Sequence, residues 1–143
     1  MTGGDAAQPE QTAFTLDLDT RVQNLRVVRR WVDEVLTDLG DDVRDDCVLV
    51  ANELVSNAFD HAQDPRRIRL RRSSEPHVVR VEVDDASPGG PVLGRSRLGD
   101  GRGRGLVIVE HVSEAWGVDS RAEGKTVWAE VPCSAKVTLR DRQ

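Results

Sequence analysis

The chain has 143 residues, of which 38% are hydrophobic and 31% charged, with a formal net charge of -5; this is enough for one domain with its own core. The acidic balance disfavours direct binding of nucleic acid through a broad basic face, and no apolar run reaches the roughly 20 residues of a membrane span. The amino-terminal residues lack the pattern of a secretory signal and the two cysteines form no C-x-x-C pair, so we expect a cytoplasmic protein that makes no contact with a membrane.

The first half of the chain predicts one strand and two helices. Residues 1–12 are small and polar and predict a disordered tail. Apolar and polar residues alternate over residues 14–18, which predicts a short strand. Apolar residues then recur at three- and four-residue steps over residues 20–40 and again over residues 42–62, which predicts two amphipathic helices.

The middle of the chain predicts a hairpin followed by a long loop. Residues 67–72 alternate between arginines and apolar residues, and residues 77–83 alternate in the same way with valines. The two stretches are separated by a turn that contains Pro76, so we expect an antiparallel pair of strands. Residues 86–104 are rich in Gly, Pro, Ser and Arg. A loop of this length in a small domain is usually functional.

The last part predicts a third helix and a second hairpin. The apolar positions from Leu106 to Ala115 predict the helix, and residues 116–120 and 126–131 predict two strands around a turn at Glu123-Gly124. We expect residues 13–133 to form one domain and residues 134–143 to be a frayed tail. Hairpin strands with grouped helices indicate an α+β two-layer sandwich, with a mixed, mostly antiparallel sheet covered on one face by three helices.

Several polar groups in this pattern are candidates for chemistry. Glu53, Asn57 and His61 recur at four-residue steps and therefore share one helix face, although a solvated face has the same spacing. Asp84 and Asp85 end an apolar strand, where a carboxylate can accept a hydrogen bond from an exocyclic amine such as that of adenine; aspartates that start a turn have the same sequence. Thr126, at a strand start, could bind a ligand or belong to a hairpin turn.

A glycine-rich segment precedes the third helix. Residues 101–105 read Gly-Arg-Gly-Arg-Gly. Alternating glycines let backbone amides approach a ligand closely, and the amino end of a helix favours an anion. The segment follows no βαβ unit and no Lys-Ser/Thr comes after it, so neither the Rossmann nor the Walker pattern applies.

In their order and spacing these signals resemble the GHKL family of ATPases, whose nucleotide-binding domain has the Bergerat fold. Residues 53–62 look like the family's N box, residues 85–89 like its first glycine box, and residues 101–106 like its second. The resemblance extends over roughly residues 14–132. The form Glu-x-x-x-Asn-x-x-x-His-Ala in a small domain is most similar to the RsbW-type anti-sigma-factor serine/threonine kinases.

The resemblance implies roles for the residues that match these boxes. Glu53 would be the general base and Asn57 would present its amide oxygen to Mg²⁺. Asp85 would bind the adenine amino group of ATP, and Thr126 would support adenine through water. His61 matches the N box, but as a residue at the helix end it receives no firm role.

The second glycine box would hold the phosphates. The resemblance implies that Gly101, Gly103 and Gly105 cradle them, that Arg104 neutralises phosphate charge, and that Leu106 completes the motif. In the first box, Gly89 keeps the second glycine position, whereas Ser87 replaces the first.

The resemblance implies a Mg-ATP-dependent protein serine/threonine kinase that phosphorylates an anti-anti-sigma (STAS-domain) partner, sequesters a sigma factor and forms a homodimer. Ser87 and the short loop over residues 90–100 leave a second interpretation open, a nucleotide-binding or degenerate module that holds a partner without catalysis. A gyrase-like or MutL-like clamp and a histidine-kinase fragment are disfavoured, because each uses further domains that we do not expect here.

Overall fold

The computed structural model describes residues 12–18, 25–61, 65–74, 77–87 and 103–133. Within these ranges the elements follow one another in the predicted order of strands and helices. They are β1 (Thr12–Leu18), α2 (Leu25–Val35), α3 (Asp41–His61), β2 (Arg66–Ser74), β3 (His77–Asp85), α5 (Gly103–Val112), β4 (Ala115–Arg121) and β5 (Gly124–Pro132).

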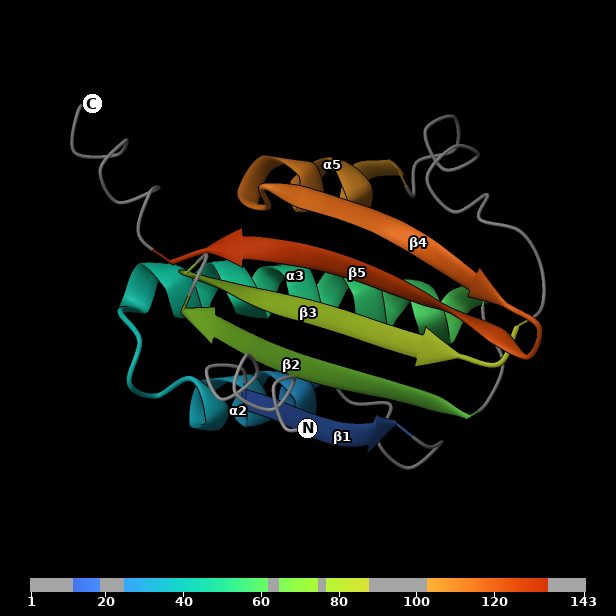
Figure 1. Cartoon of the computed structure of the whole chain (residues 1–143), viewed down its shortest axis with the longest axis horizontal. Coiled ribbons are helices and arrows are strands. Elements are labelled where there is room, and N and C mark those ends of the chain that lie inside the picture. Colours follow the sequence, from blue (N-terminus) through green and yellow to red (C-terminus); the bar gives the residue numbers. More distant parts are fainter. Residues whose placement is uncertain (1–11, 19–24, 62–64, 75–76, 88–102, 134–143) are drawn as a thin grey trace, which may run out of the picture.

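The strands form one five-stranded sheet in the order β1-β2-β3-β5-β4 (Figure 1). Each of the described strand pairings is antiparallel. The expectation of a mixed sheet is therefore corrected, since the parallel component is missing from the described part of the chain. β3 lies in the middle of the sheet between β2 and β5, so its carboxyl end is flanked by two neighbouring strands.

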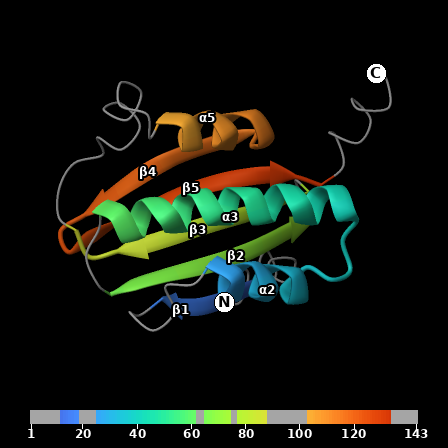
Figure 2. The same cartoon turned by 180° about the vertical axis from the view of Figure 1, so that it is seen from behind.

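The three described helices cover one face of the sheet, as the sequence predicts (Figure 2). α3 crosses the middle of the sheet, α2 lies beside it near β1 and β2, and α5 lies beside it near β4. No described helix is long and apolar enough to cross a membrane. The α+β two-layer sandwich is confirmed, and its helical layer is on the side to which the apolar residues of the strands point.

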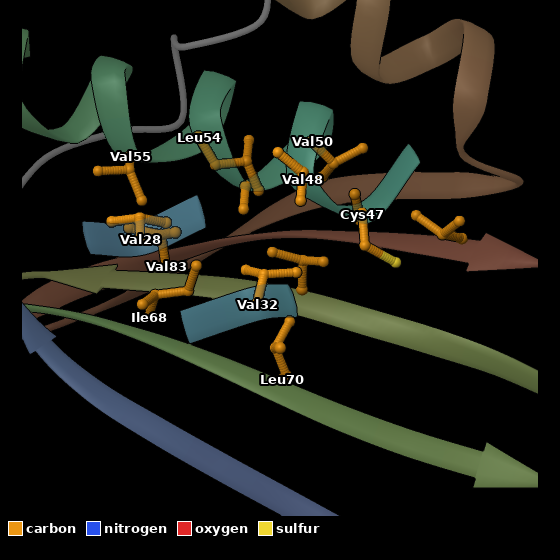
Figure 3. Packing of buried hydrophobic residues seen from close by; sticks show 14 of the residues in the cluster. Val28, Val32, Cys47, Val48, Val50, Leu54, Val55, Ile68, Leu70 and Val83 are labelled. Carbon is orange, nitrogen blue, oxygen red and sulfur yellow. The ribbon is translucent and has the colours of Figure 1, made fainter. Parts of the chain in front are cut away.

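The core lies between these two layers. Successive side chains of a strand point to opposite faces, so the apolar residues that face the helices occur at alternate positions, as Ile68 and Leu70 do in β2 and Val79, Val81 and Val83 in β3. Figure 3 shows apolar side chains of α2 and α3 meeting those of the strands, among them Val28, Val32, Leu54, Val55, Ile68, Leu70 and Val83. Each side chain of this kind that is fully buried contributes about 1.5–3 kcal/mol, so this packing holds α3 firmly on the sheet.

Both boundaries of the expected third helix differ from the structure. α5 begins at Gly103, inside the segment expected to be loop, and it ends at Val112. Ala115 does not extend this helix but begins β4, because the preceding backbone already pairs with β5 through a hydrogen bond from Glu114 N to Glu130 O of 2.8 Å.

The expected helix over residues 20–40 is shorter in the structure. α2 ends at Val35, and a turn follows in which Leu39 N donates to Leu36 O over 3.0 Å. This three-residue spacing tightens the chain before α3. Residues 19–24, in which the expected helix begins, lie outside the described residues.

The face of the sheet away from the helices is charged. Arginines of β2 and β3 alternate with carboxylates of β3 and β5, and Arg80 lies over the ring of Trp128 at 4.1 Å from its centroid. Glu82 is at the centre of these charges, and Arg69, Arg71 and Arg80 each form an ion pair with it. Neighbouring strands thus neutralise one another's charges on this face.

Candidate functional site

The carboxyl-terminal half of α3 positions the first two candidate residues. Asn57 is buried, with 9% of its surface exposed, whereas Glu53 is half-buried one turn earlier on the same helix face. No described residue hydrogen-bonds to the Asn57 side-chain amide. Contacts with residues outside the described ranges apart, this amide is therefore open to a ligand. His61 ends the helix, but its side chain lies outside the described atoms.

Contacts with β2 hold this end of α3 at one end of the sheet. Arg66 Nε donates to the backbone oxygen of Ala58 over 3.0 Å, and its guanidinium lies 5.2 Å from the centroid of the Phe59 ring. The next residue of β2, Arg67, pairs with Asp84 in β3. The register therefore brings the last turns of α3 and the carboxyl end of β3 to the same end of the sheet (Figures 1 and 2).

Asp85 is the last residue of β3, and its side chain is only 2% exposed. Its Oδ1 accepts a hydrogen bond from the backbone N–H of Ser87 over 2.7 Å. The carboxylate thus starts the turn that follows the strand, as aspartates often do. A buried carboxylate needs compensation of its charge, and Lys125 supplies it, with Nζ 3.0 Å from Oδ2 and 3.2 Å from Oδ1.

Thr126 lies on the other face of the sheet. It pairs directly with Asp84, donates its hydroxyl hydrogen to Asp84 Oδ1 over 2.6 Å, and accepts a hydrogen bond from Arg121 Nη1 over 2.5 Å. Because neighbouring residues of a strand point to opposite faces, this hydroxyl is not brought together with the Asp85 carboxylate. Lys125, which the sequence reasoning did not single out, is the β5 residue that faces Asp85.

Gly124 permits this close approach of β5 to β3. Its φ is +157°, and a Cβ at this position would come within 2.0 Å of the backbone oxygen of Asp85. A side chain here would force the strand end away from β3. Glycine at this position therefore helps to place Lys125 against the candidate adenine-binding carboxylate.

The second glycine box contributes the amino end of α5. Gly103, Arg104, Gly105 and Leu106 form the first turn of this helix, although their side chains are not among the described atoms. Figures 1 and 2 place the amino end of α5 at the end of the sheet where β3 and α3 terminate. Helix amino ends attract anions, so its position suits a phosphate. Gly89, Gly101 and the loop over residues 90–100 lie outside the described residues.

A cavity of about 590 Å³ opens at this end of the sheet, where β3 terminates. Asp85 is one of the residues that line it, although its side chain is only 2% exposed, whereas no described residue of α3 lines it. The described lining comes from the ends of β1 and β3, the start of β2 and the turn before β5, and consists of Asp17, Leu18, Pro65, Arg66, Arg67, Asp84, Asp85, Ala86, Arg121 and Glu123.

The described groups fit a magnesium nucleotide better than a metal held by protein alone. Within the described ranges there is no cluster of three or more His, Cys, Asp or Glu residues that could hold a metal ion. Mg²⁺ is usually held by one or two protein oxygens together with substrate phosphates and water. The Asn57 amide, to which no described residue hydrogen-bonds, and the amino end of α5 suit that arrangement, and Asp85 offers an acceptor for a base.

Comparison with known proteins agrees with this architecture. No protein with a curated description matches the chain. The histidine kinase domain of a blue-light activated histidine kinase, EL346 of Erythrobacter litoralis, resembles the model with a TM-score of 0.55 at 20% sequence identity, over 80% of this chain and 62% of that one. This chain thus spans less than two thirds of the solved domain, and the likeness concerns the fold.

The family assignment comes from the sequence. The family model described as "Histidine kinase-like ATPase domain" matches residues 18–131, from the end of β1 to the end of β5. This range contains all of the candidate residues on α3, β3, α5 and β5. The chain therefore belongs to the histidine kinase-like ATPase family.

Proposed function

We propose that this chain is a Mg-ATP-dependent protein serine/threonine kinase that phosphorylates an anti-anti-sigma (STAS-domain) partner and sequesters a sigma factor. The observation that carries the nucleotide part is the buried carboxylate of Asp85. Asp85 is the last residue of a central strand and one of the residues that line the cavity, and it lies at the end of the sheet where α3 ends and α5 begins. An ATPase family and a base acceptor beside an anion-attracting helix end together support ATP as the ligand.

In this proposal separate residues bind the adenine base, hold Mg²⁺ and accept the proton of the attacking group. Asp85 accepts a hydrogen bond from the amino group of adenine. Asn57 contributes its amide oxygen to Mg²⁺, and the amino end of α5 binds phosphate. Glu53, half-buried one turn before Asn57, accepts the proton of the attacking hydroxyl. Bound Mg-ATP supplies the phosphoryl group and neutralises the charge that develops on it.

The partners are proposed from the resemblance of the boxes to RsbW-type kinases. A STAS-domain protein would supply the serine or threonine that is phosphorylated. Binding of the sigma factor, assembly into a homodimer and a cytoplasmic location belong to the same proposal. Light scattering on the purified chain tests the dimer: a mass of about one chain, 15.8 kDa, at all concentrations would contradict it.

Calorimetric titration with Mg-ATP tests the nucleotide part. We expect binding to the native chain and a loss of about tenfold to a hundredfold in affinity in Asp85→Asn, because a charge-assisted hydrogen bond to the base is lost. Asp45→Asn is the matched control, since Asp45 is exposed near the start of α3, and it should bind as the native chain does. An absence of ATP binding by the native chain would contradict the proposal.

Phosphate transfer from labelled ATP to a STAS-domain partner tests the kinase part. We expect transfer by the native chain and a loss of about a hundredfold or more in Glu53→Gln, because general-base catalysis contributes this much. Glu34→Gln, an exposed glutamate on α2, serves as the control. ATP binding without transfer to any STAS-domain partner would leave the second candidate function.

That second candidate is a nucleotide-binding or degenerate module that holds a partner without catalysis. Two observations favour it. Ser87 stands where the box has glycine, and the Asp85 carboxylate already accepts a backbone hydrogen bond and an ion pair. In this case the partner would bind with and without a working Glu53, and the bound nucleotide would remain intact.

A further inference from the structure

Lys125 is a buried cation whose function neither the sequence motifs nor the family match assigns. Its side chain is 12% exposed, and its ammonium contacts both oxygens of Asp85, at 3.0 and 3.2 Å. The pair is fixed by the register of β3 and β5, in which the two residues lie directly opposite each other. The close approach of Gly124 to the Asp85 backbone holds that register.

An ion pair of this kind is poorly explained as a stabilising device. Taking two charges out of water costs about as much as their attraction returns, so that apolar residues of similar volume often serve stability equally well. Lys125 stands among apolar neighbours on its face of β5, since Val127, Ala129 and Val131 point the same way and are buried. Lys125 itself is not among the described residues that line the cavity, but it contacts Asp85, which is one of them, and this position suggests a ligand instead.

Within the described part of the chain, Asp85 retains a hydrogen-bond acceptor position and Lys125 retains an N–H donor. A carboxylate has about four acceptor positions, and Ser87 N and the two contacts of Lys125 use three of those on Asp85. An ammonium has about three N–H donors; Lys125 Nζ donates a hydrogen bond to Asp85 Oδ1 and lies 3.0 Å from Oδ2, so at most two of these donors are used on Asp85. Among the described residues, an acceptor position of Asp85 and an N–H donor of Lys125 therefore remain without a partner.

We propose that Asp85 and Lys125 read the nucleotide base together, with Lys125 donating a hydrogen bond to the ring nitrogen beside the exocyclic amine that Asp85 binds. This inference rests on the proposed binding of ATP. Adenine presents an amino donor next to a ring-nitrogen acceptor, which complements the acceptor and the donor of the pair. Guanine presents a carbonyl acceptor next to an N–H donor, which is the reverse order. Lys125 is thus a specificity-determining residue.

The test compares ATP with 1-deaza-ATP, in which the ring nitrogen is replaced by C–H, by calorimetric titration in the presence of Mg²⁺. The native chain should bind the analogue about tenfold or more weakly, because a hydrogen bond from a charged donor is lost. Lys125→Met should bind ATP about as weakly as the native chain binds the analogue. The same variant should bind the two ligands equally, and Lys125→Arg should restore part of the preference because it keeps a charged donor.

Arg72→Met is the matched control. It removes an ion pair with Asp38, with contacts of 2.9 Å, at the opposite end of the sheet, and it should leave the ratio of the two affinities unchanged. Thermal unfolding followed by tryptophan fluorescence shows whether each variant is folded.

Several results would overturn the inference. An equal affinity of the native chain for ATP and 1-deaza-ATP would overturn it without any variant. Tighter ATP binding by Lys125→Met would show that the lysine competes with the base for Asp85. A variant that weakens both ligands by one factor, with the native ratio kept, would show a purely structural role. An absence of ATP binding by the native chain would instead contradict the proposed function on which the inference rests.

Discussion

Glu82 is the residue whose loss should most disturb the charged face of the sheet. Its side chain is only 7% exposed although no described helix covers this face. It accepts a hydrogen bond from Arg80 Nε over 2.6 Å and one from Arg71 Nε over 3.0 Å, and Arg69 Nη2 lies 3.1 Å away. Glu82→Ala therefore removes the negative charge that three guanidinium groups share.

The magnitude follows from what each arginine keeps. Arg69 keeps an ion pair with Asp84 at 2.9 Å, and Arg80 keeps one with Glu130 at 3.0 Å. Removing one partner of a buried pair costs about 3–5 kcal/mol. Because the arginines are partly exposed and two of them keep a partner, we expect about 2–3 kcal/mol. For a chain of this size this lowers Tm by about 6–10 °C.

Urea denaturation followed by tryptophan fluorescence measures this loss, since Trp128 lies under Arg80. Glu130→Ala is the control. Glu130 is 30% exposed and bonds only to Arg80 among the described ion pairs, so its loss should cost about 0.5–1 kcal/mol. If the two variants lost the same free energy of unfolding, or if Glu82→Ala matched the native chain, the reasoning from shared charge would be refuted.

Three further predictions concern the site, the acid response and the thiols. Gly124→Ala places a Cβ within 2.0 Å of the Asp85 backbone oxygen, so it should cost at least about 1–3 kcal/mol of stability in urea denaturation and weaken Mg-ATP binding; a native-like variant would contradict this. Burial opposes ionisation of Glu82, but hydrogen bonds from two arginines outweigh it, and its pKa lies below the ordinary 4.5. The stability that it contributes is therefore complete above about pH 4.5 and is lost as the pH falls through the lowered pKa. Urea midpoints between pH 7 and pH 3 should fall less in Glu82→Gln than in the native chain, and parallel curves would refute the assignment. Burial raises the pKa of the Cys47 thiol, so a maleimide at pH 7.5 should leave it unlabelled in the native chain and label it in urea; mass spectrometry that finds rapid native labelling would show the packing around it to be wrong.

The order of elements could be predicted because the signals behind it are local. Alternation over residues 67–72 and the three- and four-residue steps over residues 42–62 report which side of each element is buried. The boundaries of α5 could not be predicted in the same way. Gly103 and Gly105 are poor helix formers in isolation, yet they begin the helix. Ala115 fits a helical stripe, yet pairing between β4 and β5 takes it into the sheet.

The sequence by itself determined the fold class, because residue type and spacing along one element need no knowledge of its neighbours, and the resemblance of its boxes to the family selected Asn57, Glu53 and Asp85 as candidates. Only the tertiary structure decided that Lys125, and not Thr126, faces Asp85. The physical reason is the register between β3 and β5, because a shift of one residue moves every side chain of a strand to the opposite face. A local pattern can identify the two faces of β5, but only the paired strand decides which face meets the carboxylate.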